Sequence, residues 1–298
     1  MPPKLQKGDL VAIVAPSGKL YSDNLDQAIV LLQSWDLEVV VGKYVWDNYF
    51  SFAAIDEKRQ EDFQTAIDTP EIKAIFCARG GYGVSRIIDS LNFDTFKKKP
   101  KWIIGFSDIT AFHAHLYTLG FQSLHACMPS QYHGKCTFEA VESIRKALFE
   151  TPINLNALAN PSNKLGEVTG TLAGGNLCLI NDMIGTKSDF ETEKTILYIE
   201  EINEPLYSID RMFTHLNRIG KLEKLAGLVV GDLDTKPNHG NEFGITLEDI
   251  ILEKVGKYNY PVGFNFPIGH RPHNIAVING ANAHLKVTGE LSSLTFSL

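Results

Sequence analysis

The first half of the chain alternates between continuous apolar runs and segments in which apolar residues recur at helical spacing. The apolar runs are typical of strands buried on both faces, as in a parallel sheet. These runs are 9–15, 37–41, 74–78 and 102–105. The helical spacing predicts helices at about 23–35, 58–68, 85–91 and 108–119. This order predicts βαβ units and therefore an α/β domain with a mainly parallel sheet.

The second half has a different pattern. Residues 154–166 are polar and irregular, which predicts a linker. The strand candidates beyond it are shorter and are separated by glycine-rich turns. They are 166–172, 195–199, 225–230 and 283–288. We therefore expect an α/β protein with an N-terminal parallel-sheet domain at 1–153, a linker at 154–166 and a second, β-richer domain at 167–298.

Composition and charge narrow the classes of function. Hydrophobic residues make up 44% and charged residues 21% of 298 residues, as in an ordinary globular protein. A net charge of −7 argues against a broad nucleic-acid-binding surface, which needs clustered lysine and arginine. Lys97 to Lys99 and Lys101 form the only basic cluster, and a solvated loop explains them.

The cysteines and the chain start bear on cellular location. Four cysteines without a C-x-x-C pair predict reduced thiols, and their spacing does not favour a metal site. No apolar run approaches the roughly 18 residues of a membrane span, and the first residues show no secretory signal pattern. We expect a cytoplasmic protein with no metal, cofactor, membrane or nucleic-acid partner.

Ser107 is the first candidate for chemistry. It follows a short apolar strand in Gly105-Phe-Ser-Asp108 and precedes an amphipathic helix. A serine at a strand-to-helix turn is exposed and lies close to free backbone N–H groups, as an acyl-transfer nucleophile requires. The alternative is a helix N-cap, for which serine is well suited. The sequence lacks the last glycine of G-x-S-x-G, so this is not the α/β-hydrolase elbow.

A glycine-rich turn, Arg79-Gly80-Gly81-Tyr82-Gly83, directly follows the third apolar run. Its glycines permit positive φ and a close approach of the backbone to a ligand. The third glycine of a dinucleotide fingerprint and the lysine of a P-loop are both absent. The turn therefore suits an oxyanion or a carboxylate, with Arg79 as a carboxylate-binding fork. The alternative is a tight turn without a ligand.

Two further segments carry titratable side chains. The apolar run 197–199 ends in Glu200 and Glu201, which point to opposite faces if the strand continues through them. Surface acidic residues at a strand end are the alternative. His270 lies in the loop Gly269-His-Arg-Pro-His-Asn274, where a histidine is accessible and can titrate near neutral pH.

Taken together and in this order, these segments resemble the LD-carboxypeptidase family of serine peptidases. The resemblance extends from about residue 10 to 285, and five or more motifs in sequence make it specific. The matching segments are Ala-Arg-Gly-Gly-Tyr-Gly at 78–83, Gly-Phe-Ser-Asp-Ile-Thr at 105–110, Leu-Ala-Gly-Gly-Asn-Leu at 172–177, the acidic strand end at 197–204, Tyr-Ser-Ile-Asp-Arg-Met at 207–212 and Gly-His-Arg-Pro-His-Asn at 269–274.

The resemblance implies a Ser–Glu–His triad assembled across the cleft between the two domains. Ser107 would be the nucleophile and His270 the base, with Glu200 favoured as the carboxylate and Glu201 left open. The resemblance further implies an oxyanion hole from the backbone N–H groups of Gly81 and Asp108, and substrate contacts from Arg79 and Tyr82.

The implied activity is hydrolysis of the bond between an L-centred diamino acid and a terminal D-alanine, as in the murein tetrapeptide released during cell-wall recycling. The resemblance also implies a homodimer and no cofactor. Two alternatives remain open. One is an immunity-type peptidase that cleaves a peptidyl-nucleotide antibiotic, and the other is a non-catalytic two-domain protein that binds a carboxylate ligand.

Overall fold

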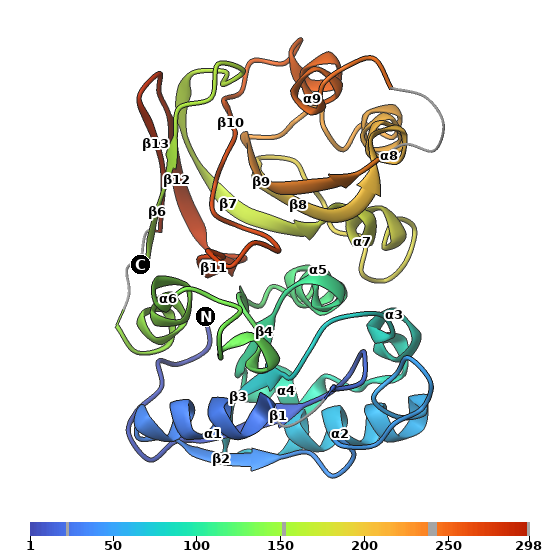
Figure 1. Cartoon of the computed structure of the whole chain (residues 1–298), viewed down its shortest axis with the longest axis vertical. Helices are drawn as coiled ribbons and strands as arrows, with labels where there is room; N and C mark the ends of the chain where they lie inside the picture. Colours follow the sequence, from blue (N-terminus) through green and yellow to red (C-terminus); the bar gives the residue numbers. More distant parts are fainter. Residues whose placement is uncertain (22–23, 151–152, 238–242, 297–298) are drawn as a thin grey trace.

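The computed structural model describes residues 1–21, 24–150, 153–237 and 243–296, and in these ranges the strands form two sheets (Figure 1). The first sheet has the order β11-β5-β4-β3-β1-β2, in which β1 to β5 are parallel and β11 is antiparallel to β5. Its strands are β1 (Leu10–Val14), β2 (Glu38–Val41), β3 (Ile72–Cys77), β4 (Trp102–Gly105), β5 (Ser123–His125) and β11 (Val277–Asn279).

Helices connect and cover the strands of this sheet, as the alternating pattern predicts. They are α1 (Asn24–Ser34), α2 (Asp56–Asp68), α3 (Val84–Ile87), α4 (Asp94–Lys98), α5 (Thr110–Thr118) and α6 (Phe138–Phe149), with 3-10 turns η1 (Ile88–Ser90), η2 (Ser107–Ile109) and η3 (Pro129–Gln131). Asp23, near which the first helix is predicted to begin, lies outside the described residues.

The second sheet is mixed and has the order β10-β9-β8-β7-β12-β13-β6. Strands β7 to β10 are parallel, and β12, β13 and β6 extend the sheet in antiparallel fashion. The strands are β6 (Asn154–Leu158), β7 (Gly166–Asn176), β8 (Thr195–Pro205), β9 (Gly227–Lys236), β10 (Val262–Gly263), β12 (Asn282–Val287) and β13 (Leu291–Phe296). The helices are α7 (Leu177–Asp182), α8 (Leu206–Arg218) and α9 (Leu247–Val255). The predicted two-domain α/β fold is therefore confirmed.

The predicted linker is wrong for its first residues. Asn154 to Leu158 form β6, an edge strand that pairs with β13 of the second sheet. Leu155 and Ala157 are buried and alternate with exposed Asn154, Asn156 and Leu158. The segment is polar because its outward face carries asparagine, while its inward face packs on the sheet.

The basic cluster matches the predicted solvated loop only in part, because Lys97 to Lys99 are exposed but Lys101 is not. Lys97 and Lys98 end the short helix α4, and Lys101 is buried with 2% of its surface exposed. Its ammonium donates to the carbonyls of Ala66 and Thr69 at 3.0 and 2.6 Å, at the end of α2. Burial lowers the pKa of Lys101 to about 8. Lys101 therefore stabilises a helix C-terminus.

The two domains share their core. One hydrophobic cluster contains Ile103 of β4 and Ile199 of β8, and a second contains their neighbours Ile104 and Tyr198. Because successive strand residues point to opposite faces, each cluster runs along one face of both sheets. Strand β11 reinforces this connection, since it lies between β10 and β12 in the chain but pairs with β5 of the first sheet. No helix in the described parts of the chain is long and apolar enough to cross a membrane.

Candidate active site

The candidate site lies where the carboxyl ends of three parallel strands of the first sheet meet the second sheet. Loops at the carboxyl ends of parallel strands are the usual ligand sites of open α/β sheets. Ser17 and Gly18 follow β1, the glycine-rich turn follows β3, and Ser107 follows β4. This shared edge explains why segments far apart in sequence are brought together.

Ser107 occupies a strained turn. Its φ is +63°, and that of Gly105 is +157°. The left-handed region costs a residue other than glycine about 1–2 kcal/mol, and such strain persists only where the surroundings impose it. The interpretation of Ser107 as a helix cap is wrong, because no side chain caps the start of η2 or α5. Within the described ranges the Ser107 hydroxyl makes no hydrogen bond.

The glycines at 18 and 80 allow the turns to pack around Ser107. A side chain on Gly80 would place its Cβ 3.1 Å from the Cβ and 3.3 Å from the Oγ of Ser107. The N–H of Gly18 donates to the carbonyl of Gly80 at 3.1 Å. A Cβ at Gly18 would lie 2.7 Å from that same oxygen. Gly18 therefore has no room for a side chain, and a side chain at Gly80 would require Ser107 and Met128 to shift.

The side chain of Asp108 ties these turns together, a role that sequence reasoning missed. Its Oδ2 accepts from the hydroxyl of Ser17 at 2.6 Å and from the N–H of Val84 at 2.9 Å. Burial raises the pKa of Asp108, and these two hydrogen bonds oppose that rise. Neither the N–H of Asp108 nor that of Gly81 donates to another described residue. Both are left available for a ligand.

Glu200 and His270 form a buried pair contributed by the second domain. The Oε2 of Glu200 lies 2.7 Å from the Nδ1 of His270, and Glu200 is fully buried. Because a carboxylate only accepts, Nδ1 carries the proton and Nε2 is free to accept one. Burial lowers the pKa of His270, but the hydrogen bond and charge of Glu200, with Glu201 and Asp232, outweigh it and raise the pKa overall.

Glu201 faces the other side of β8 and has a different role. Its Oε1 accepts from Asn176 Nδ2 at 2.9 Å and from its neighbour Ile202 at 2.8 Å, and its Oε2 accepts from the N–H of Cys178 at 2.8 Å. Asn176 is also the N-cap of α7. The prediction that the two glutamates diverge is confirmed, and Glu201 fastens the start of α7.

The loop that carries His270 is fastened on both sides. Gly269 has φ of +144°, and a Cβ there would lie 2.7 Å from the Cβ of Asp232. Its N–H donates to the buried Asn274 side chain at 3.1 Å. The Arg271 guanidinium pairs with Asp234 at 2.7 Å. Thr137 of the first domain donates its N–H to the carbonyl of Pro272 at 2.9 Å.

The structure thus brings His270 to the serine turn without joining it to the hydroxyl. The ring of Phe106, directly before Ser107, lies 4.8 Å from the His270 ring. No hydrogen bond joins Ser107 to His270 in the described structure. Such contacts are often long without substrate and tighten in the complex.

Arg79 and Tyr82 lie at the rim of the site on the first domain. Arg79 donates to the carbonyl of Lys19 at 2.5 Å, and its guanidinium lies 4.6 Å from the ring centre of Tyr21. Tyr82 is 56% exposed and packs on Phe52 with ring centres 5.8 Å apart. Both side chains are accessible to a ligand, although Arg79 already uses part of its fork.

His113 is a second residue that sequence reasoning missed. Its Nε2 lies 2.8 Å from the carbonyl of Gly105, and its Nδ1 lies 2.7 Å from the hydroxyl of Ser123. Burial lowers the pKa of His113 to about 4, so the ring is neutral. It holds the backbone two residues before Ser107. A polar residue on the inner face of the helix after Ser107 is the signal that points to it.

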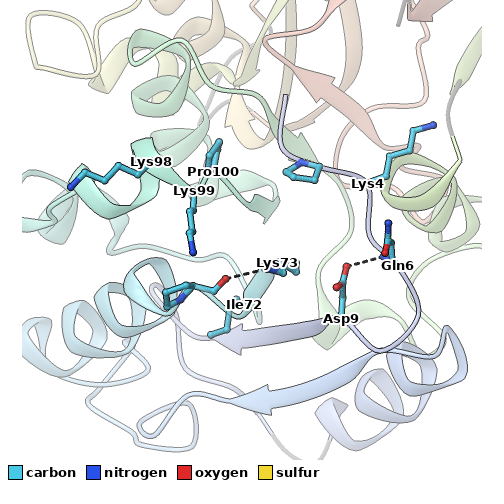
Figure 2. Close-up of a pocket in the computed structure, with 10 residues that line it drawn as sticks. Lys4, Gln6, Asp9, Ile72, Lys73, Lys98, Lys99 and Pro100 are labelled. Carbon is cyan, nitrogen blue, oxygen red and sulfur yellow. Dashed lines mark hydrogen bonds between the residues drawn. The ribbon is translucent and has the colours of Figure 1, made fainter.

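A pocket of about 470 Å³ lies at the amino ends of the strands of the first sheet, beside Asp9 before β1 and Ile72 at the start of β3 (Figure 2). Several lysines line it, but Figure 2 shows Lys98 extending away from the other lining side chains. Ser107 lies at the carboxyl end of β4, so the length of the parallel strands separates it from this pocket. It takes no part in the candidate site.

A strained serine next to free backbone N–H groups, with a buried glutamate–histidine pair facing it, is an arrangement of the serine hydrolase class. Residues 11–126 match the LD-carboxypeptidase N-terminal domain, and residues 169–285 match the LD-carboxypeptidase C-terminal domain. The chain belongs to the LD-carboxypeptidase family of serine peptidases.

Individual relatives agree along nearly the whole chain. A probable murein peptide carboxypeptidase of Bacillus subtilis is 33% identical over 290 residues, which covers 95% of this chain and 90% of the relative. The crystal structure of muramoyltetrapeptide carboxypeptidase from Oxalobacter formigenes is 28% identical, with a TM-score of 0.87 over 97% of this chain and 99% of that one. The microcin C7 self immunity protein MccF has the same fold, with a TM-score of 0.87 at 19% identity over 100% of this chain and 98% of that one.

Proposed function

We propose that this protein is a serine carboxypeptidase that removes the terminal D-alanine from a murein tetrapeptide during cell-wall recycling. The observation that carries the proposal is the buried pair of Glu200 and His270, 2.7 Å apart, beside the strained turn of Ser107. Similarity to carboxypeptidases named for murein peptides supports the choice of substrate.

In the proposed mechanism Ser107 attacks the carbonyl carbon of the scissile bond while His270 Nε2 takes the hydroxyl proton. Glu200 keeps the other ring proton on Nδ1 and stabilises the imidazolium that forms. The N–H groups of Gly81 and Asp108 donate to the oxyanion of the tetrahedral intermediate.

The carbon–nitrogen bond then breaks, and His270 Nε2 gives its proton to the departing D-alanine amine. An acyl ester on Ser107 remains. Water attacks this ester as His270 takes one of its protons, and the carbon–Oγ bond breaks with return of that proton to Ser107. The tripeptide product leaves with a free carboxylate.

Arg79 is the proposed partner of the substrate's terminal carboxylate. One of its five N–H donors is used on Lys19, which leaves others for a ligand. The exposed ring of Tyr82 supplies a wall for the peptide next to the glycine-rich turn.

The test is Ser107→Ala, assayed by release of D-alanine from murein tetrapeptide. We expect a loss of at least about a thousandfold, since removing a triad nucleophile costs that much or more. Ser34→Ala in the exposed part of α1 is the control and should keep full activity. Full activity of Ser107→Ala with an intact fold contradicts the proposal.

The same preparation separates the alternatives. A fluorophosphonate should label Ser107 of the wild type. A non-catalytic carboxylate-binding protein would give neither an adduct nor D-alanine. An immunity-type peptidase would prefer a peptidyl-nucleotide, so a competition between the two substrates distinguishes it. We also propose a cytoplasmic homodimer, which cell fractionation and sedimentation measure.

A further inference from the structure

A group of buried polar atoms lies behind the Glu200–His270 pair. Glu200, Tyr198 and His125 each have 0% of their surface exposed. In the parts of the chain that the structure describes, the Oε1 of Glu200, the hydroxyl of Tyr198 and both ring nitrogens of His125 have no hydrogen-bond partner. The proposed mechanism uses only the other oxygen of Glu200.

These three residues are neighbours although they come from both sheets. Tyr198 and Glu200 are two residues apart on β8 and therefore lie on one face of it. The ring of His125 in β5 lies 5.4 Å from the Tyr198 ring, at 86°. Phe106 links the group to the site, with ring centres 5.7 Å from His125 and 4.8 Å from His270.

A buried polar atom without a hydrogen-bond partner destabilises the folded state. Several such atoms at one place therefore indicate a hydrogen-bond network that they share. More than nine in ten buried polar groups have a partner, and a buried carboxylate oxygen without one favours protonation of the group. Internal water satisfies such atoms where it finds about two to four polar partners.

Tyr198 and His125 can both donate a hydrogen bond. Burial, followed by electrostatic interaction with His113 and His270, lowers the pKa of His125 well below its ordinary value, so its ring is neutral and carries one N–H. Burial and the charge of Glu200 raise the pKa of Tyr198 well above its ordinary value, so its hydroxyl keeps its proton.

We propose that Tyr198 and His125 are positioning residues for Glu200, which they reach through internal water bonded to its Oε1. The proposal rests on the function proposed for the Glu200–His270 pair. With Oε1 held by donors, the carboxylate stays ionised and its Oε2 stays directed at Nδ1 of His270.

The first variant is Tyr198→Phe, which removes only the hydroxyl. We expect kcat for D-alanine release to fall about tenfold with KM unchanged, the size expected for a lost hydrogen bond to a charged group. Loss of the donor leaves more charge on the oxygen facing Nδ1 and also eases protonation of the carboxylate. Both effects move the acid limb of kcat/KM to higher pH.

A readout independent of turnover is the titration of His270 followed by NMR, which should shift in the same direction. Glu200, Glu201, Asp232 and His125 are the titratable groups whose charges act on or respond to His270, and the substitution leaves all of them in place. If the wild type releases no D-alanine but Tyr198→Phe still shifts the His270 titration, only the proposed function is overturned.

Tyr260→Phe is the matched control. Tyr260 is buried, and its hydroxyl donates to the carbonyl of Leu222 at 2.8 Å, outside the candidate site. This variant should lower the melting temperature and leave the acid limb and the His270 titration unchanged.

His125→Phe, which keeps an aromatic ring, is the second variant and should shift the same two readouts. If Tyr198→Phe and His125→Phe both leave kcat, the acid limb and the His270 titration at wild-type values, the network does not exist. An unchanged or raised melting temperature in those variants would also show that the Tyr198 hydroxyl and the His125 ring nitrogens make no hydrogen bond in the folded protein.

Discussion

The adjacent residues Glu200 and Glu201 offer a paired test of the site. Replacement by glutamine should lower activity but not stability at position 200, and stability but not activity at position 201. Glu200→Gln keeps the size of the side chain but removes the charge that faces His270 Nδ1. A glutamine amide that donates to Nδ1 forces the proton onto Nε2, which then cannot accept from Ser107. The equivalent change in a Ser–His–Asp triad costs about 10⁴ in kcat, so we expect a loss of about 10³–10⁴, or roughly 4–5 kcal/mol.

Stability should respond in the other direction. Glu200 is fully buried and one of its oxygens has no partner among the described residues. Above the pKa of His270 the ring is neutral, so Glu200 is a buried charge without a counter-charge, and glutamine removes the cost of burying that charge. At such a pH the melting temperature of Glu200→Gln should therefore equal or exceed that of the wild type.

Glu201→Gln should show the reverse pattern. Glu201 accepts three hydrogen bonds, from Asn176, Cys178 and Ile202. A glutamine has one acceptor oxygen, so at least one of these donors loses its partner, at about 1.5–3 kcal/mol each for a charged acceptor. Unfolding by heat or denaturant should show this loss, while D-alanine release changes by less than about threefold.

The reasoning is refuted if Glu201→Gln abolishes D-alanine release while Glu200→Gln keeps it. It is also refuted if Glu200→Gln inactivates only by unfolding, which calorimetry and circular dichroism on the same samples detect. Labelling of Ser107 by a fluorophosphonate should be slowed in Glu200→Gln and unaffected in Glu201→Gln, which provides a second assay.

Three further predictions concern the serine turn and the two histidines. Gly80→Ala places a methyl group 3.1 Å from the Cβ of Ser107 and should lower kcat/KM about tenfold or more. The control Gly289→Ala, with nothing within 4 Å of the new methyl group, should leave activity and stability unchanged. Equal activities of the two variants would contradict the packing argument. The pKa of His270 is raised above 6.5, so kcat/KM should fall with decreasing pH through a midpoint above that value, and a midpoint at or below it in a pH–rate profile counts against the assignment. The pKa of His113 is about 4 in the folded protein against 6.5 ordinarily, so the unfolded chain binds more protons between these values. The free energy of unfolding should therefore decrease by about 3 kcal/mol as the pH is lowered through this window. Denaturation of His113→Gln should show a shallower dependence on pH, and an equal slope would refute the claim.

The fold is largely predictable from the hydrophobic pattern. Runs such as 74–78 and 102–105 mark strands buried on both faces, and the structure places β3 and β4 there. The short β6 was missed because asparagine and leucine alternate in it and resemble a loop. Strand β11 has only three residues, and its pairing with β5 depends on contacts across about 150 positions, to which local pattern is blind.

The site was partly predictable for a geometric reason. Ser107 and the glycine-rich turn each directly follow a predicted strand of a parallel sheet, and residues at the carboxyl ends of such strands lie close together. Local pattern contains no information on the positive φ of Ser107 or on which glutamate meets His270, since both depend on register and packing. The side chain of Asp108 and the ring of His113 were missed because their partners are contributed by other segments.

Strand β11 has a consequence for how the protein matures on the ribosome. Domains generally fold in the order of synthesis, with the N-terminal one first. Here the edge of the first sheet is supplied by Val277–Asn279, which is translated after His270 and almost at the end of the chain. A nascent first domain therefore carries Ser107 on an unfinished sheet, with an open edge beside β5. Because His270 and β11 belong to the same late segment, we expect closure of that edge and delivery of the base to occur together, as one late step of folding.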